Sequence, residues 1–319
     1  MRYEKKVIVL SSVLVGLLAI WAAGILFSPE RVAARSESTR LIAGKAADVA
    51  SIVFASPGAA SLELGKSGSA WELADGSAKL PVRAERVSSF LSDLEAIKRL
   101  RLVARSKDSW AGFKLDEAQA KRATLKDSSG KVLADILLGG YGPTGTEVYL
   151  RRASSDSSYI ADTGLASYLD YGRTGWLDLA LFGGLKEGDV QSFSLKSDIA
   201  LDGKGKGAIK LDYSLRRDGK LWKAGAAQVD AEAVASLLRS VIGLQSEDYA
   251  SAPPADAFAK LGASIKLELG SGKSVSLEVG AEAGKDRFYA RTSDRNLVAL
   301  VSSYSLRAGL KSLAELAGK

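Results

Sequence analysis

The apolar and polar residues divide the chain into one uncharged N-terminal run and a long region of shorter, mixed patterns. Residues Val7 to Phe27 are 21 consecutive positions without a charged side chain. As a helix that rises about 1.5 Å per residue, this run would measure about 31 Å, close to the hydrocarbon thickness of a bilayer. The pattern therefore predicts a transmembrane helix in contact with the lipid bilayer.

Basic residues before this run set its expected orientation. Arg2, Lys5 and Lys6 lie on the N-terminal side, and the positive-inside rule places such a flank in the cytoplasm and the region after Phe27 outside. A cleaved signal peptide is the alternative, since small residues at positions 22–24 are typical of a cleavage zone. The apolar core of a signal peptide has about 7 to 15 residues, so we favour an uncleaved signal anchor.

A polar stalk follows the run. It covers residues 28–47 and carries three arginines, which favour the opposite orientation, although two glutamates lie among them. We therefore expect residues 1–27 to form a cytoplasmic tip and a membrane anchor. Residues 48–185 and 186–319 are predicted as two modules, with the glycine-rich stretch 183–188 between them.

The sequences of the two modules indicate an internal repeat. Val82–Leu91 and Val229–Leu238 share six of ten residues at an offset of 147. The flanking landmarks keep their order along the chain. They are Trp71 and Trp222, the turns Ser129-Gly-Lys131 and Ser271-Gly-Lys273, and the segments Val148–Arg151 and Phe288–Arg291.

Each copy alternates between period 2 and period 3.6, which predicts an α+β fold with a mainly antiparallel sheet and one or two packed helices. Strands are expected in the first copy at Ser61–Leu64, Ala70–Leu73, Ala123–Lys126, Val132–Leu138 and Glu147–Arg151. Helices are predicted from the apolar stripes Val87, Phe90, Leu91, Leu94, Ile97 and Val234, Leu237, Leu238, Val241, Leu244. A third helix is expected from Leu306, Leu310, Leu313 and Leu316.

Composition removes several chemistries. His and Cys are absent and the only Met is the first residue, so disulfides, Cys or His metal sites, thiol nucleophiles and His-based triads are excluded. We expect no metal and no cofactor. The net charge of +7 is spread thinly over the chain, and nucleic acid is not an expected partner.

Two short motifs resemble catalytic or phosphate-binding patterns. Gly270–Ser274 resembles the end of a phosphate-binding loop, but Leu267 stands where that pattern needs a glycine, and Ser128-x-x-Lys131 has the spacing of a Ser-Lys pair. Both are predicted to be hairpin turns. Glu85 and Glu232 are repeated acids, and each is expected in the first turn of a helix, where the dipole stabilises it.

The densest basic cluster follows the first helix. Its members are Lys98, Arg99, Arg101, Arg105 and Lys107. One interpretation is a basic helix C-terminus that complements the helix dipole. The alternative is a contact with anionic lipid headgroups or with an acidic partner surface.

Four landmarks follow one another along the chain: Ala70–Leu73 with the helix beginning at Pro81, Phe113–Asp116, Glu147–Arg151 and Trp176–Asp178. Through this ordered set, over about residues 48–319, the chain resembles the bacterial family called domain of unknown function 4340. Phe113-Lys114 stands where the family usually has Tyr-Gly before its Leu-Asp turn. The resemblance implies a single-span protein of the bacterial cytoplasmic (inner) membrane, encoded beside ABC transporters of the gliding-motility or exopolysaccharide-export type. It implies no catalytic residue.

These observations favour a non-enzymatic, membrane-anchored accessory or scaffold protein of the cell envelope, whose partner is an ABC transporter permease or another envelope protein. One rival hypothesis is an envelope hydrolase that uses Asp/Glu or Ser-Lys chemistry, for which two carboxylates about 5 to 10 Å apart in a cleft would be needed. The other is a glycan- or peptide-binding module with exposed sheet edges.

Overall fold

The computed structural model describes residues 14–18, 21, 41–97, 100–201, 207–284 and 286–317. Residues 14–18 and 21 are helical, while the rest of the predicted span Val7 to Phe27, and the stalk as far as residue 40, lie outside the described residues. Within the described ranges, no helix combines the length and the apolar character that crossing a membrane requires. The transmembrane anchor and the stalk stay predictions.

The first module is built on an antiparallel sheet of nine strands in the described part of the chain, in the order β4-β3-β2-β1-β6-β7-β8-β9-β5. The strands are β1 (Ser51–Ala55), β2 (Leu62–Ser67), β3 (Ala70–Asp75), β4 (Ala78–Pro81), β5 (Arg101–Ala104), β6 (Lys121–Lys126), β7 (Val132–Tyr141), β8 (Glu147–Arg152) and β9 (Ser158–Asp162). The helical elements are η1 (Ala46–Asp48), α3 (Ala84–Ala96), η2 (Lys107–Ser109), α4 (Trp110–Phe113), α5 (Leu165–Leu169) and α6 (Arg173–Trp176).

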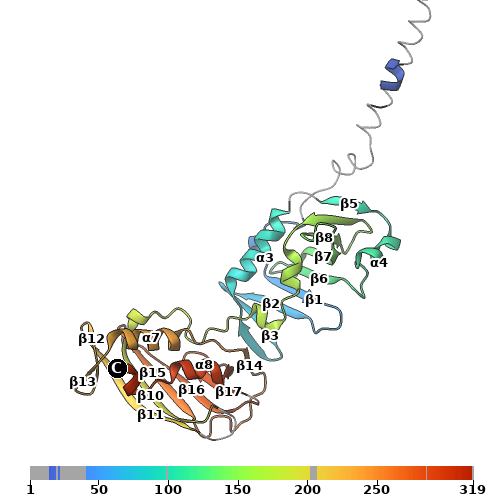
Figure 1. Ribbon diagram of the computed structural model, residues 1–319. Helices are drawn as coiled ribbons and strands as arrows, with labels where there is room; N and C mark the ends of the chain where they lie inside the picture. The colour runs from blue at the N-terminus through green and yellow to red at the C-terminus, as the bar shows by residue number, and fades with distance from the viewer. Residues whose placement is uncertain are drawn as a thin grey trace, which may run out of the picture. The chain divides into compact units, whose positions relative to one another are not determined.

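The second module repeats this plan with the order β13-β12-β11-β10-β15-β16-β17-β18-β14. Its strands are β10 (Val190–Ile199), β11 (Ile209–Asp218), β12 (Leu221–Ala224), β13 (Ala227–Val229), β14 (Asp248–Tyr249), β15 (Ala263–Leu269), β16 (Ser274–Glu282), β17 (Arg287–Thr292) and β18 (Ala299–Ser302). Its helical elements are η3 (Glu187–Asp189), α7 (Ala231–Ile242), α8 (Ser303–Gly309) and α9 (Leu313–Leu316). Figure 1 shows α7 and α8 lying against this sheet. The predicted duplication and the α+β class are confirmed.

Both predicted helix stripes face the interior. In α3, Val87, Phe90, Leu91 and Leu94 are buried, and the Phe90 ring meets Phe54 edge-on at 5.2 Å between centroids. The matching buried residues of α7 are Val234, Leu237, Leu238 and Val241. The last members of the two stripes, Ile97 and Leu244, are buried but lie just beyond the helix ends.

The landmark residues of the repeat occupy equivalent places. Trp71 on β3 and Trp222 on β12 are both buried. Gly130 and Gly272 adopt φ values of +84° and +80° in the β6–β7 and β15–β16 turns. That left-handed conformation favours glycine. The motifs at Ser128–Lys131 and Gly270–Ser274 are therefore hairpin turns, as predicted.

A glycine marks a β-bulge at the same place in each module. The register shifts after Leu138 in β7 and after Val279 in β16. A Cβ at the next residue would lie 2.2 Å from the Phe113 carbonyl oxygen for Gly139, and 2.0 Å from the Ala257 carbonyl oxygen for Gly280. Both positions therefore need glycine, because a backbone carbonyl of another segment lies against the strand there.

The turn after α4 contains a lysine in a conformation that favours glycine. Lys114 has φ 57° and ψ 36°, the left-handed region. This conformation costs a residue with a Cβ about 1 kcal/mol. The position is the one where Phe113-Lys114 departs from the Tyr-Gly of the resembling family.

The single C-terminal helix predicted from Leu306, Leu310, Leu313 and Leu316 is wrong. The chain forms two short helices, α8 and α9, separated at residues 310–312. Ser312 and Glu315 form a capping box that starts α9 anew. A capping box satisfies the free N–H groups of a helix start, so a new helix begins at Leu313. The four leucines are therefore spaced as in one helix but are divided between two.

The chain forms two compact units. One comprises residues up to Trp71 together with Arg83–Gly172, and the other comprises Glu72–Val82 together with Arg173–Lys319. Most of β3 and all of β4 are thus grouped with the second unit. The boundary expected at residues 185 and 186 stays a prediction.

Candidate functional site

The basic cluster surrounds edge strand β5 of the first unit. Arg101 lies on β5, Arg105 follows the strand and is exposed, and Lys107 begins η2. Lys98 and Arg99 lie outside the described residues. Helix α3 ends at Ala96 without a basic residue in its last turn, so the helix-dipole interpretation fails for the three described members.

Arg101 and Lys107 each have an acidic neighbour. An Nη atom of Arg101 lies 3.0 Å from a carboxylate oxygen of Glu147, and Lys107 Nζ lies 3.5 Å from Asp156. The Arg101 and Lys107 side chains nevertheless remain 67% and 64% exposed. Surface ion pairs of this kind contribute about 0 to 1 kcal/mol, and they leave the cationic groups open to solvent.

A cavity of about 370 Å³ opens beside the start of β5. Ile97 and Ile160 give it apolar walls, and Arg101 and Glu147 line it with their ion pair. It is an open depression on the surface of the first unit, and the remaining lining residues include Ala161 and Asp162 of β9.

A buried arginine supports helix α4 and the residues that follow it. Arg151 on β8 is 2% exposed, its Nε donates to the Leu115 carbonyl oxygen at 3.0 Å, and its guanidinium carbon lies 3.7 Å from the centre of the Trp110 ring. Burial lowers the pKa of Arg151 from its ordinary value, while nearby carboxylates, of which Glu117 acts most, oppose this effect. The contacts identify Arg151 as the support of α4.

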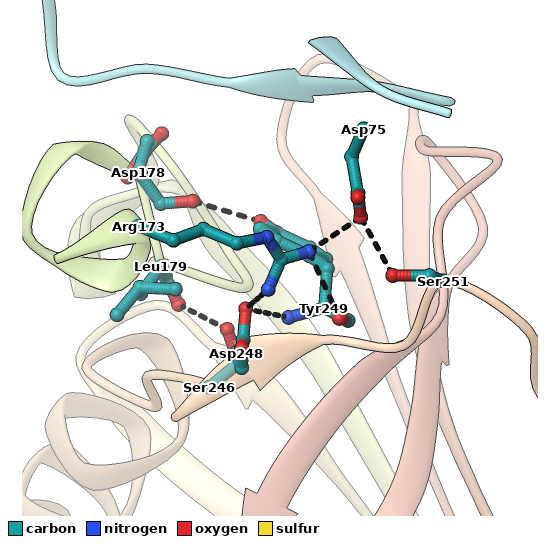
Figure 2. A network of polar contacts seen from close by, with 8 residues as sticks. All are labelled: Asp75, Arg173, Asp178, Leu179, Ser246, Asp248, Tyr249 and Ser251. Atoms are coloured by element: carbon teal, nitrogen blue, oxygen red, sulfur yellow. Dashed lines mark hydrogen bonds and ion pairs between the residues drawn. The ribbon is translucent and has the colours of Figure 1, made fainter. Parts of the chain in front are cut away.

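The second unit contains a network centred on Arg173 of α6 (Figure 2). Its guanidinium forms ion pairs with Asp75 at 2.8 Å and with Asp248. It also donates to the Tyr249 carbonyl oxygen at 3.3 Å. The Ser251 hydroxyl donates to Asp75 at 2.6 Å. Segments far apart in sequence therefore meet at one guanidinium.

The Asp75 carboxyl is held in its ionised form. The hydrogen bond from Ser251 lowers its pKa most. Burial has the next largest effect and raises the pKa, while the charge and the hydrogen bond of Arg173 lower it further, so the net shift is downward. A general acid needs the opposite shift. Asp75 and Asp248 are thus two carboxylates in one place, but Arg173 binds both, and this arrangement suits a structural network.

A second arginine extends the network along the linker after α6. Arg295 lies 3.7 Å from Asp178 and donates to the Ala180 carbonyl oxygen at 3.0 Å. The Tyr249 hydroxyl donates to the Asp178 carbonyl oxygen at 2.8 Å (Figure 2). Asp178 belongs to Trp176–Asp178, one of the landmarks of the family resemblance, and the contacts of Asp178 are structural.

The repeated acids Glu85 and Glu232 lie in the first turns of α3 and α7, where their helix-dipole interpretation placed them. Across the described ranges, no group of three or more acidic residues is placed to hold a metal ion. Sequence reasoning missed the Arg173 network because its members, at positions 75, 173, 248 and 251, share no local spacing.

The two edge strands β5 and β14 carry opposite charges at equivalent positions of their sheets. Arg101 occupies this position in the first sheet, and Asp248 occupies it in the second. The pairs that establish this are Arg101 with Ile160 and Ile160 with Tyr149, and Asp248 with Leu300 and Leu300 with Tyr289. Tyr149 and Tyr289 are equivalent landmarks of the repeat.

Comparison with known proteins identifies one family. Residues 71–257 and 220–319 match the family described as a domain of unknown function (DUF4340). No curated protein and no solved structure matches the chain.

Proposed function

The chain belongs to the DUF4340 family of domains of unknown function, and from its sequence and structure we propose that it is a membrane-anchored, non-enzymatic accessory or scaffold protein of the bacterial cell envelope. It is associated with an ABC-type transport system and binds a permease or another envelope protein. The observation that carries the proposal is the duplicated sheet module behind an uncharged run long enough to span a bilayer.

The uncharged run supports the location. Its 21 residues match the thickness of a bilayer, and the basic residues before it favour a cytoplasmic N-terminus. Both modules are then extracytoplasmic, on the outer side of the cytoplasmic membrane. The association with an ABC transporter rests on the family resemblance alone.

The state of the perturbed carboxylates supports a structural role for them. Ser251 and Arg173 lower the pKa of Asp75. Burial pushes the pKa of Asp135 upward, but two hydrogen bonds from Arg122 reverse this and the net shift is downward. These carboxylates stay charged and hold ion pairs, so neither is prepared to act as a general acid.

Affinity purification of the full-length protein from mildly solubilised membranes, followed by mass spectrometry, tests the proposal. The matched control is the chain without residues 1–27. We expect reproducible recovery of an ABC permease or ATPase with the full-length protein and its loss with the control. Recovery of the protein alone, in monodisperse form, would contradict the scaffold function and direct work to hydrolase and glycan assays.

A further inference from the structure

We draw no further inference here: the strongest candidate, the groove of about 570 Å³ between α8 and the C-terminal end of α7 in the second unit, has the exposed Tyr304 on its wall, but Lys311, a cation that lines it, is paired with Glu315, and nothing in the structure shows what covers it.

Discussion

The guanidinium of Arg151 lies 3.7 Å from the centre of the Trp110 ring, and the second module repeats the contact with Arg291 4.3 Å from the centre of Phe258. The two arginines are equivalent, but their surroundings differ. Arg151 is buried, whereas Arg291 is exposed and pairs with Glu278 at 2.7 Å.

This difference predicts unequal effects of the same substitution. Arg151→Ala should lower the free energy of unfolding by about 2 to 4 kcal/mol, because it removes a desolvated cation–π contact and the bond to the Leu115 carbonyl. Arg291→Ala should cost less than about 1 kcal/mol. Urea unfolding of the two variants measures the difference, and equal losses would contradict it.

The two bulge glycines predict a steric penalty. Gly139→Ala and Gly280→Ala each place a Cβ against a backbone carbonyl at about 2 Å, and we expect a loss of about 1 to 3 kcal/mol or more in each case. Gly65→Ala on β2 meets no atom within 4 Å and is the matched control. Thermal melts that place all three variants together would refute the close approach.

The backbone conformation of Lys114 indicates that replacing this residue with glycine stabilises the folded protein. Because its φ is 57°, Lys114→Gly should relieve the strain of the left-handed conformation. The gain, after the greater entropy of glycine in the unfolded chain, is about 0.5 to 1 kcal/mol. An increase in the urea midpoint checks this. A decrease would mean that the lysine side chain contributes more than the strain costs.

The polar network in the second unit is expected to lose its stabilising ion pairs when Arg173 is replaced. Arg173→Met leaves Asp75 and Asp248 without their shared cation, and we expect a loss of about 2 to 3 kcal/mol. Adding Asp248→Asn should recover part of that loss, since it removes one uncompensated charge. Additive effects in this double-mutant cycle would show that the two residues do not interact.

The lowered pKa of Asp75 predicts a pH dependence with a definite sign. The ionised form is favoured in the folded protein, so its contribution is complete above the ordinary value of about 4 and disappears as the pH falls through the lowered value. The difference in Tm between wild type and Asp75→Asn should therefore shrink between about pH 5 and pH 2. Ser251→Ala, which removes the leading cause, should make this change smaller.

The repeat and the main helices were predictable because patterns of residues close together in the sequence determine them. Val87, Phe90, Leu91 and Leu94 follow the helical period, and their counterparts in α7 repeat it. Edge strands β5 and β14, with four and two residues, are too short to show a period. The single C-terminal helix was a wrong prediction because Ser312 and Glu315 cap a new helix, α9, so the leucine spacing does not belong to one helix.

The polar network was beyond prediction from one sequence for a different reason. Arg173 meets Asp75 and Asp248 through the fold, at separations of 98 and 75 residues. No local pattern encodes such a meeting. The basic cluster was visible, but its position on a sheet edge depended on knowing where α3 ends.

The opposite charges at one ladder position have a consequence for the duplication itself. An edge strand moved from the second copy into the first would set a carboxylate beside Glu147, and the reverse exchange would set Arg101 against Arg173. The charge of each edge strand therefore matches only its own module. Although the two modules share a strand order, β5 and β14 cannot replace each other, and a chimera in which these two strands are exchanged is expected to lose both ion pairs.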